Sequence, residues 1–341
     1  MKTAILQNGQ KSDWDAFVDS HGDATAWHIY DWGKLVGSHY RVTYYPIAVY
    51  DGREVCGILP LYQVRTWRTG TMLISIPYMV AGGIVARDHE CQHLLLERAI
   101  ELSRALGSVP IILKQYKNRI DGPLETDDGY YNLELPLTDD IAVLWNGLDE
   151  ENRVQVEQSR RQDVQVEYPY REFDTFYRSL LKNQRVSGVP CPTRRWIKLL
   201  LNSGIYEMAV LRLQGRIAVA ALVKKFKESL SFPLTSLPQG EELGGPLAYR
   251  LYWDIIAQTA KDGFDVYYSG RIRGSEPVAS FRTGWGGERC RYYYQTFGRP
   301  AGQASVSSRK GRKRKLFEAV WRRSPTPLTR LIGPFLIRQY P

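Results

Sequence analysis

The chain has 341 residues, of which 43% are hydrophobic and 24% are charged. This length predicts two domains, each large enough to bury its own core, and the composition is that of a folded soluble protein. The 46 Lys and Arg residues outnumber the 36 Asp and Glu residues, so the formal net charge is +10. A polyanionic partner fits this charge, whether RNA, a nucleotide-linked substrate or an anionic membrane, but net charge alone does not choose among them.

The sequence lacks the usual marks of a secreted or membrane-spanning chain. The N-terminus turns polar after three apolar residues, so it has no signal-peptide core. No apolar run approaches the ~20 residues that a membrane-spanning helix needs. We therefore expect a cytoplasmic protein. The four cysteines are scattered without CxxC spacing, which indicates reduced structural thiols rather than a disulfide framework.

Helical and strand patterns alternate in the first part of the chain. The Asp51-Gly52 dipeptide between two apolar runs predicts a β-hairpin, and Gly107 ends a helical pattern. The predicted elements are, in order, helices over 12–18 and from residue 27, a hairpin over 45–64, a strand over 72–86 interrupted by Pro77 and Gly82-Gly83, a helix over 94–106 and a strand over 109–113.

A similar order returns later in the chain. The hairpin glycines Gly52 and Gly215 lie 163 positions apart, and the helix-ending Gly107 and Gly263 lie 156 positions apart. Two matched landmarks at nearly one offset predict an internal duplication of a mixed α/β unit. The later elements are helices over 173–181 and 194–201, a hairpin over 206–226, a strand over 230–237, a helix over 246–260 and a strand over 264–269.

These elements divide the chain into four parts. We predict a first domain over 1–137, a connecting segment over 138–168, a second domain over 169–298 and a basic C-terminal tail over 299–341. The connecting segment is charged and is interpreted as a strand-to-helix connection. The tail carries six cations between residues 309 and 315, followed by a short predicted helix.

The stretch 264–286 has the features of a site. After its strand, a glycine-flanked loop carries Arg271 and Arg273, and Arg282 follows shortly before the aromatic Trp285. Three arginines on a glycine-rich backbone can hold phosphate or carboxylate groups through forked, permanently charged donors. The alternative is an exposed basic loop.

Several short motifs carry a family resemblance through their order and spacing. They are Trp27-His28 with Trp32, residues 57–61, residues 74–78 with Gly82-Gly83, Gly270-Arg271, residues 281–286 and residues 332–334. Together they resemble the FemABX-like branch of the GNAT superfamily, and most closely the FemAB-related proteins found beside exopolysaccharide and exosortase clusters. The resemblance covers nearly the whole chain. It implies an α/β (α+β) fold of two tandem GNAT-like domains, each a mixed central sheet flanked by helices, without a coiled-coil arm.

The chain departs from the family pattern at three places. Relatives usually have lysine where this chain has Arg282, a DFGRSK-like run where it has YSGRIR, and later basic positions where Glu157 and Gln158 follow Asn152-Arg153. A lysine can titrate, whereas an arginine only holds charge. We therefore interpret Arg282 as the holder of a phosphate or an oxyanion, and the departures as signs of a divergent substrate.

The resemblance implies transfer of an activated acyl group to an amine of a cell-envelope or secondary-metabolite precursor, without a tightly bound cofactor. Two donors stay open, aminoacyl-tRNA and acyl-CoA. An acyl-CoA donor normally needs an R/Q-x-x-G-x-G/A loop, and the nearest run, 271–276, ends in Glu276 rather than a small residue. This and the net charge favour aminoacyl-tRNA, so we expect tRNA and a small-molecule or nucleotide-linked amine as partners. The alternatives are an acyl-CoA-dependent acyltransferase of exopolysaccharide biosynthesis and a non-catalytic FemAB-like protein that binds a precursor or a membrane.

The second domain offers no histidine base, because all five histidines lie at residue 93 or before. Transfer from an activated ester needs little beyond proximity and oxyanion stabilisation. Tyr267, Tyr268 and Asp265 are the nearest groups for the amine proton, although strand tyrosines also serve packing. We assign Arg282, Tyr268 and Asp265 to catalysis, and Lys34, Trp32, Arg153, Arg271, Arg273 and Trp285 to substrate binding.

Three further features have competing interpretations. His89 and His93 have i, i+4 spacing but lack a third ligand and an HExxH pattern, so we predict no metal site. Lys34 lies near the position where relatives place a lysine for substrate phosphate, and the alternative is an exposed helix lysine. The basic segment 309–321 would touch tRNA or anionic lipid headgroups at the inner face of the membrane, and the alternative is a solvated tail.

Overall fold

The chain forms two compact units of mixed α/β structure. The computed structural model describes residues 1–6, 10–236, 245–274, 279–298 and 312–341. Unit 1 consists of Met1–Tyr130, Arg291–Arg309 and Ile337–Pro341, and unit 2 consists of Tyr131–Cys290 and Lys310–Leu336. Each unit contributes parallel and antiparallel strand pairs, flanked by helices, to a mixed sheet, which confirms the predicted fold class. None of the helices in the described ranges has the length and apolar character needed to cross a membrane.

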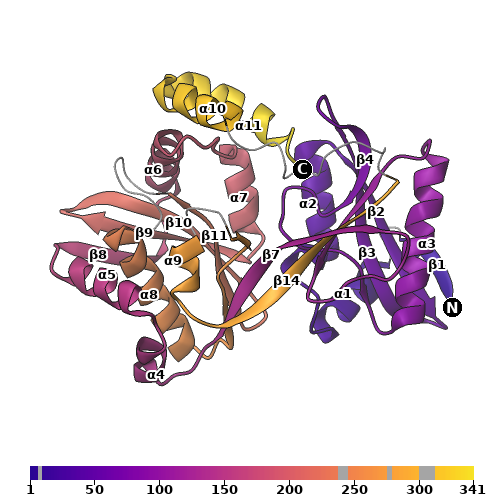
Figure 1. The fold of residues 1–341 in the computed structure, drawn as a ribbon, viewed down its shortest axis with the longest axis horizontal. Helices are drawn as coiled ribbons and strands as arrows, with labels where there is room; N and C mark the ends of the chain where they lie inside the picture. The colour runs from indigo at the N-terminus through magenta and orange to yellow at the C-terminus, as the bar shows by residue number, and fades with distance from the viewer. Residues whose placement is uncertain (7–9, 237–244, 275–278, 299–311) are drawn as a thin grey trace. The chain divides into compact units, whose positions relative to one another are not determined.

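Unit 1 has the strand order β1-β2-β3-β4-β6-β14, in which β4 and β6 pair in parallel and the other neighbours are antiparallel. The β2–β3 hairpin turns at Asp51-Gly52, as predicted. Helices α1 and α2 pack on one face of the sheet and α3 on the other (Figure 1). Its elements are β1 (Lys2–Ile5), α1 (Lys11–Ser20), η2 (Ala26–His28), α2 (Tyr30–Tyr40), β2 (Thr43–Asp51), β3 (Glu54–Thr66), β4 (Gly70–Ser75), β5 (Val85–Ala86), α3 (His89–Ala105), β6 (Ile111–Tyr116) and most of β14 (Glu288–Phe297).

Helix α3 shows how the sequence builds the core of unit 1. Asp88 begins the helix, because its side chain accepts a hydrogen bond from the backbone N–H of Cys91 at 2.8 Å. Cys91, Leu95 and Ala99 then follow at i, i+4 and i+8, and all three are fully buried against the sheet. Burial of a leucine of this kind stabilises the fold by about 2 kcal/mol.

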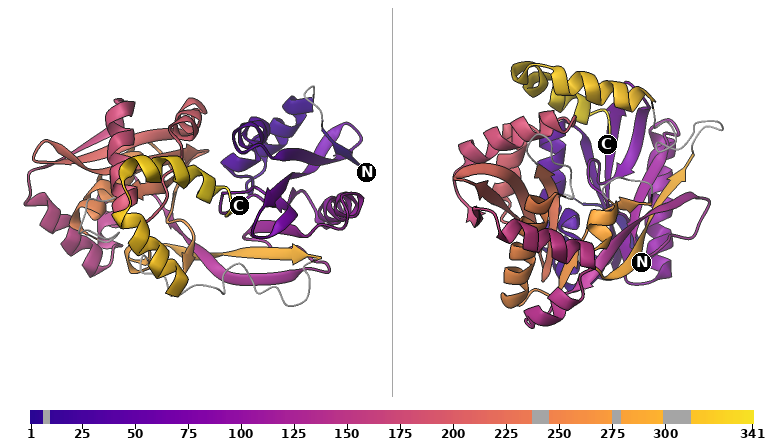
Figure 2. Two further views of the ribbon diagram at one scale, coloured as in Figure 1. Left: turned by 90° about the horizontal axis from the view of Figure 1, so that it is seen from above. Right: turned by 60° about the vertical axis from the view of Figure 1, so that its left-hand side comes forward.

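Unit 2 has the strand order β7-β12-β11-β10-β9-β8, in which only the β11–β12 pair is parallel among the pairings described. Helices α5 and α8 cover one face of this sheet, and α6 and α7 cover the other (Figures 1 and 2). The elements are β7 (Glu125–Pro136), α4 (Ile141–Asn146), α5 (Glu150–Arg160), β8 (Val164–Tyr170), α6 (Phe173–Val186), α7 (Arg194–Asn202), β9 (Tyr206–Leu213), β10 (Arg216–Phe226), β11 (Ser229–Ser236), α8 (Pro246–Lys261), β12 (Val266–Tyr268), β13 (Ile272–Arg273), α9 (Ala279–Thr283), α10 (Arg312–Arg323) and α11 (Thr326–Ile337).

The units differ from the predicted domain boundaries because of two long strands. Residues Tyr292–Phe297 of β14 pair with β6 and belong to unit 1, although we predicted them within the second domain. The end of β7 pairs with β12 and belongs to unit 2, although we predicted it within the first domain. The predicted connecting segment 138–168 forms α4, α5 and most of β8, which are integral parts of unit 2.

Candidate functional site

The sheet of unit 2 opens where β11 and β12 separate. Their parallel pairing joins Ser229–Ser231 to Val266–Tyr268, and β11 continues to Ser236 beyond the last of these pairs. The chain leaves β12 through Gly270, whose φ of +84° favours glycine. Asn132 fixes this turn, because its Oδ1 accepts hydrogen bonds from the Gly270 N–H at 2.9 Å and from the Ser269 hydroxyl at 3.3 Å. The carboxyl ends of parallel strands are the usual place for a ligand in α/β sheets.

Arg282 is presented at this opening by two aromatic anchors. Phe281 and Trp285, four positions apart, are 1% and 0% exposed and contact the rings of Tyr249 and Tyr252 in the core of unit 2. This packing holds the short helix α9 in place. The half-buried Arg282 between the anchors donates a hydrogen bond from Nη1 to the carbonyl oxygen of Arg271.

The same segment requires a glycine at position 284. A Cβ atom added there would lie 2.3 Å from Asn152 Oδ1 and 2.5 Å from Asp149 Oδ2. The Gly284 carbonyl also accepts a hydrogen bond from the Asp149 N–H at 3.0 Å. This close approach fixes α9 against the start of α5 and explains why a glycine precedes Trp285.

Two tyrosine hydroxyls lie buried near Arg282. The Tyr252 hydroxyl and Thr235 Oγ1 are 2.9 Å apart and share a hydrogen bond. Tyr267 is 1% exposed, and its hydroxyl has no hydrogen-bond partner among the described residues. Burial raises the pKa of Tyr267 well above its usual range, and the Arg282 charge opposes this only in part. Tyr267 therefore remains a neutral hydroxyl that can donate to a ligand oxygen.

On the face of the sheet opposite Arg282, five polar residues on neighbouring strands pair with one another in turn. In strand order they are Tyr206, Lys224, Ser231, Tyr268 and Glu134. Lys224 is only 6% exposed, and burial lowers its pKa to about 8. At neutral pH this amine is partly deprotonated, which suits a proton acceptor.

Sequence reasoning missed Lys224. It lies in the apolar run of β10 on the same face as Ala220 and Leu222, where a lysine interrupts an otherwise apolar alternation. That interruption was the available signal, because lysine is almost never fully buried without a reason.

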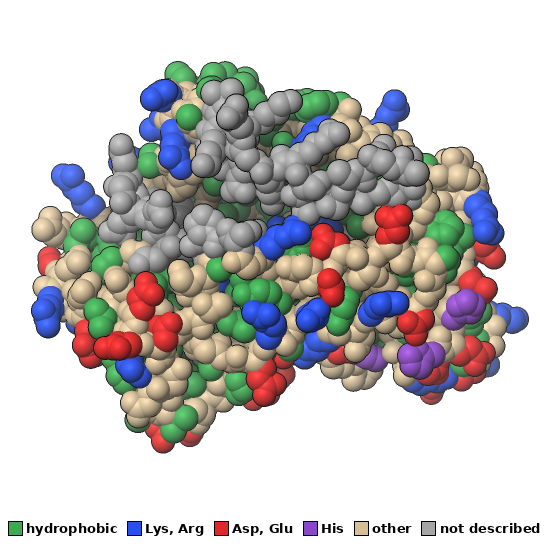
Figure 3. Space-filling view, viewed as in Figure 1, with side chains coloured by type: hydrophobic (Ala, Val, Ile, Leu, Met, Phe, Trp, Pro, Cys, Tyr) green, Lys and Arg blue, Asp and Glu red, His purple; other side chains and the backbone are tan. Residues whose placement is uncertain are grey.

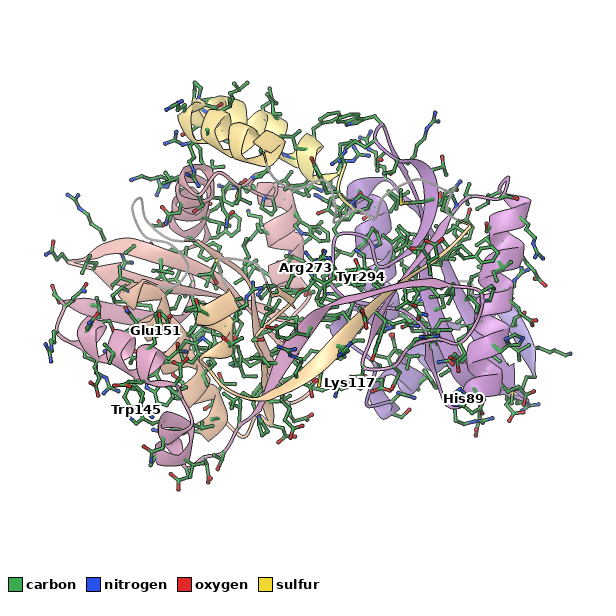
Figure 4. All side chains as sticks on the ribbon, viewed as in Figure 1. His89, Lys117, Trp145, Glu151, Arg273 and Tyr294 are labelled. Carbon is green, nitrogen blue, oxygen red and sulfur yellow. The ribbon has the colours of Figure 1, made fainter. Side chains whose placement is uncertain are left out.

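The predicted residues of unit 2 fall into two groups. Arg271, Arg282 and Tyr268 lie at the end of β12, and Arg273 follows in β13, where it is half-buried (Figure 4). Their assigned roles remain predictions.

Three other predicted residues of unit 2 have structural positions. Arg153 donates from Nη1 to the carbonyl oxygens of Asn146 and Leu148, at 3.2 and 3.0 Å, where α4 ends. Trp285 is fully buried and packs against the rings of Tyr249 and Tyr252. Asp265 lies exposed before β12, at the end of the strand away from Gly270, and its backbone pairs with Leu137 and Glu228.

Lys34 and Trp32 lie on α2 in unit 1. Trp32 is 2% exposed and belongs to the core, whereas Lys34 is exposed, 3.6 Å from Asp31 and above the ring of Tyr30. A small polar cavity of about 50 Å³ lies elsewhere in the unit, lined in part by His28, Gly83 and Gln115. His28 Nε2 is 3.1 Å from the Gly83 carbonyl oxygen, so these two motif residues link η2 to the loop before β5.

Comparison with solved structures identifies the fold. FemX superposes with a TM-score of 0.63 at 13% identity, over 86% of this chain and 97% of FemX. A tandem GNAT protein from the clavulanic acid biosynthesis pathway gives 0.54 at 11% identity, over 88% of this chain and 99% of the other. This chain has a tandem GNAT fold.

The fold is shared more widely than the sequence. The C-terminal domain of an Agrobacterium fabrum protein assigned as a lysylphosphatidylglycerol synthetase gives a TM-score of 0.54 at 12% identity, over 86% of this chain and 94% of that domain. No protein-family model and no curated protein sequence matches the chain. The resemblance to FemABX-like GNAT proteins is therefore confirmed in the fold, and the chemistry must be argued from the site.

Proposed function

We propose that this protein is an N-acyltransferase that forms an amide on an amine of a cell-envelope or secondary-metabolite precursor, with aminoacyl-tRNA as the donor. The observation that carries the proposal is the placement of Arg282 at the carboxyl ends of β11 and β12, anchored by Phe281 and Trp285. Similarity to FemX and to a protein assigned as a lysylphosphatidylglycerol synthetase supports an aminoacyl donor. The net charge of +10 supports a tRNA partner.

In the proposed reaction, negative charge develops beside hydrogen-bond donors that the fold holds in place. The amine nitrogen attacks the ester carbonyl carbon, a C–N bond forms, and negative charge develops on the carbonyl oxygen. The Arg282 guanidinium and the Tyr267 hydroxyl stabilise this oxyanion as preorganised donors. The C–O bond to the tRNA ribose then breaks, and the leaving ribose oxygen takes up one proton, which balances the proton that the amine loses.

Lys224 is the proposed acceptor of the proton that the attacking nitrogen loses. Burial brings its pKa to about 8, close to neutrality. Its cross-strand neighbour Ser231 pairs in turn with Tyr268, on the face of the sheet opposite Arg282. Activity should then rise with pH through this pKa.

An acyl-CoA donor is the second candidate. Similarity to the tandem GNAT protein from clavulanic acid biosynthesis, whose structure was determined without AcCoA, supports it. The run 271–276 is the part of the sequence most similar to the phosphate-binding loop of acyl-CoA enzymes. The structure describes its Gly274, whereas Ser275 and Glu276 lie outside the described residues.

The test offers both donors to the purified full-length protein. Radiolabelled aminoacyl-tRNA or acetyl-CoA is supplied with a pool of amine acceptors, and label in amide products is counted. We expect consumption of aminoacyl-tRNA, with a loss of about 100-fold or more in Arg282→Ala. The control is Arg216→Ala, which removes an exposed arginine at the β9–β10 turn. If neither donor is consumed while a nucleotide-sugar still binds, the protein is a non-catalytic binding protein and the proposal fails.

A further inference from the structure

The C-terminal hairpin of unit 2 exposes an apolar stripe. On α11, Leu328, Leu331, Ile332 and Phe335 are 44%, 78%, 36% and 56% exposed. Their i, i+3, i+4, i+7 spacing places them on one face of the helix. Phe317 and Val320 on α10 are also exposed. We call these six side chains the hairpin stripe. Figure 3 shows hydrophobic side chains at the top of the view, over the position of α10 and α11 in Figure 1.

Contacts on the other side of the hairpin fix this orientation. Thr329 and Gly333, on the inner side of α11, are buried, and a Cβ atom added at Gly333 would lie 3.3 Å from the Cys191 carbonyl oxygen. Trp321 of α10 is 6% exposed and donates from Nε1 to the Val189 carbonyl oxygen at 3.2 Å.

Arg185 of α6 adds a polar clamp, because its Nη1 donates to the carbonyl oxygens of Arg322 and Ser324 at 3.0 and 3.2 Å. The hairpin is therefore docked on unit 2 through its inner side. Its apolar stripe faces outward in the docked state.

The charge along the hairpin is mainly positive, since Glu318 of α10 is the one acidic residue in the sequence from residue 312 onward. After Glu318 the sequence contains no acidic residue, and it contains four arginines. Of these, Arg322 and Arg323 are exposed at the end of α10, whereas Arg330 is exposed on the side of α11 toward Tyr177 and not beside the stripe. A helix face of large apolar side chains with flanking cations is typical of segments that lie in the interface of an anionic membrane. An RNA partner would need aromatic platforms with cations, whereas four of the six stripe residues are aliphatic.

We propose that the hairpin stripe docks on an anionic lipid surface, with Leu331 and Phe335 inserted and the flanking arginines against the headgroups. This inference goes beyond the proposed transfer reaction and does not depend on it. From the sequence we expected the membrane contact in segment 309–321, whereas this inference places it mainly on α11. Of that segment, 309–311 lie outside the described residues, and Trp321 faces the protein interior.

The test is vesicle flotation with the full-length protein. Vesicles of phosphatidylcholine alone are compared with vesicles that contain about 30% phosphatidylglycerol, at low salt and at high salt. We expect binding to the anionic vesicles that weakens with salt. Leu331→Ser combined with Phe335→Ser should lower the partition coefficient at least tenfold. Val143→Ser, which removes an exposed apolar side chain on α4, should leave it unchanged.

Other outcomes would overturn the inference. Because both substituted side chains are exposed, the double variant should keep the melting temperature of the wild type. Equal binding of wild type and double variant to anionic vesicles, or no binding by either, would refute lipid docking. If the double variant instead abolishes a dimer seen by sedimentation velocity, or tRNA binding in a gel-shift assay, the stripe serves that partner and the inference is wrong.

Discussion

Replacement of Lys224 by methionine should make the protein more stable at neutral pH. Burial lowers the pKa of Lys224 from its ordinary value of 10.5 to about 8. At ~1.4 kcal/mol for each pKa unit, the charged form is destabilised in the fold by about 3 kcal/mol. Methionine has a similar length and carries no charge, so Lys224→Met removes this cost. The figure is an upper estimate, because the lysine's own polar contacts are lost as well.

The pH dependence of the stability gained by Lys224→Met shows whether the buried charge is its cause. Between about pH 8 and pH 10.5 the unfolded chain binds a proton at this lysine that the folded chain has released. The free energy of unfolding of the wild type therefore rises with pH over that window. Below it, the lysine is charged in both states and the full cost remains. The advantage of Lys224→Met should thus be largest near pH 7 and should vanish as the pH approaches 10.5.

Urea unfolding of the wild type and the variant at pH 7, 8, 9 and 10 provides the measurement, since other titrating groups cancel in the difference. The control is Lys225→Met, which removes a partly exposed neighbour 3.5 Å from Glu207 and should not stabilise the fold. A destabilised Lys224→Met, or a gain that does not change with pH, would refute the reasoning. If Lys224 also accepts the reaction proton, the stabilised variant should lose turnover.

Three further predictions test the packing of unit 2. Gly284→Ala should lower the free energy of unfolding by about 1–3 kcal/mol in urea titrations, because its Cβ meets Asn152, whereas Gly274→Ala, with open space around it, should change little. Arg185→Ala should release the α10–α11 hairpin and accelerate its tryptic cleavage, and an unchanged cleavage rate would show that the clamp contributes nothing. Burial raises the pKa of the Cys191 thiol to about 12, so a maleimide at pH 8 should label it only in urea.

The hairpins were predictable because their determinants are local. Gly52 and Gly215 have φ values of +63° and +75°, which the Asp-Gly and Gln-Gly dipeptides supply between apolar runs. The helix predicted over 246–260 forms as Pro246–Lys261 for a similar reason, since a proline starts it and a glycine follows it. In each case the signal lies within a few residues of the structure that it specifies.

The long strands β7 and β14 were missed because their pairing is not local. Tyr292 pairs with Tyr116, and Tyr268 pairs with Glu134, across more than a hundred positions in each case. Periodicity shows that a segment suits a sheet but does not name its neighbour. The predicted boundaries at 137 and 298 therefore missed the exchange of strands between the two halves of the chain.

The candidate site was predictable in part. Arg271 and Arg282 stand out in the sequence because cations on a glycine-rich loop suit anion binding, and the structure joins them by a hydrogen bond. Trp285 and Arg153 were also predicted to bind substrate, yet one is fully buried and the other donates to the carbonyl oxygens at the end of α4. Only the packing of distant elements decides which side chains remain accessible.

The strongest physical argument for a site is the position of two costly residues. A core selected for stability alone would have phenylalanine at Tyr267 and methionine at Lys224, since a buried hydroxyl without a described partner and a buried amine each destabilise the fold. Both residues lie on strands flanking β11, next to Leu230 and Ser231, at the position where the β11–β12 pairing ends. Costs of this kind persist where a function requires them. Because Tyr267 and Lys224 lie at the same level of the sheet, one on each face, they favour a ligand at this opening over a purely structural explanation.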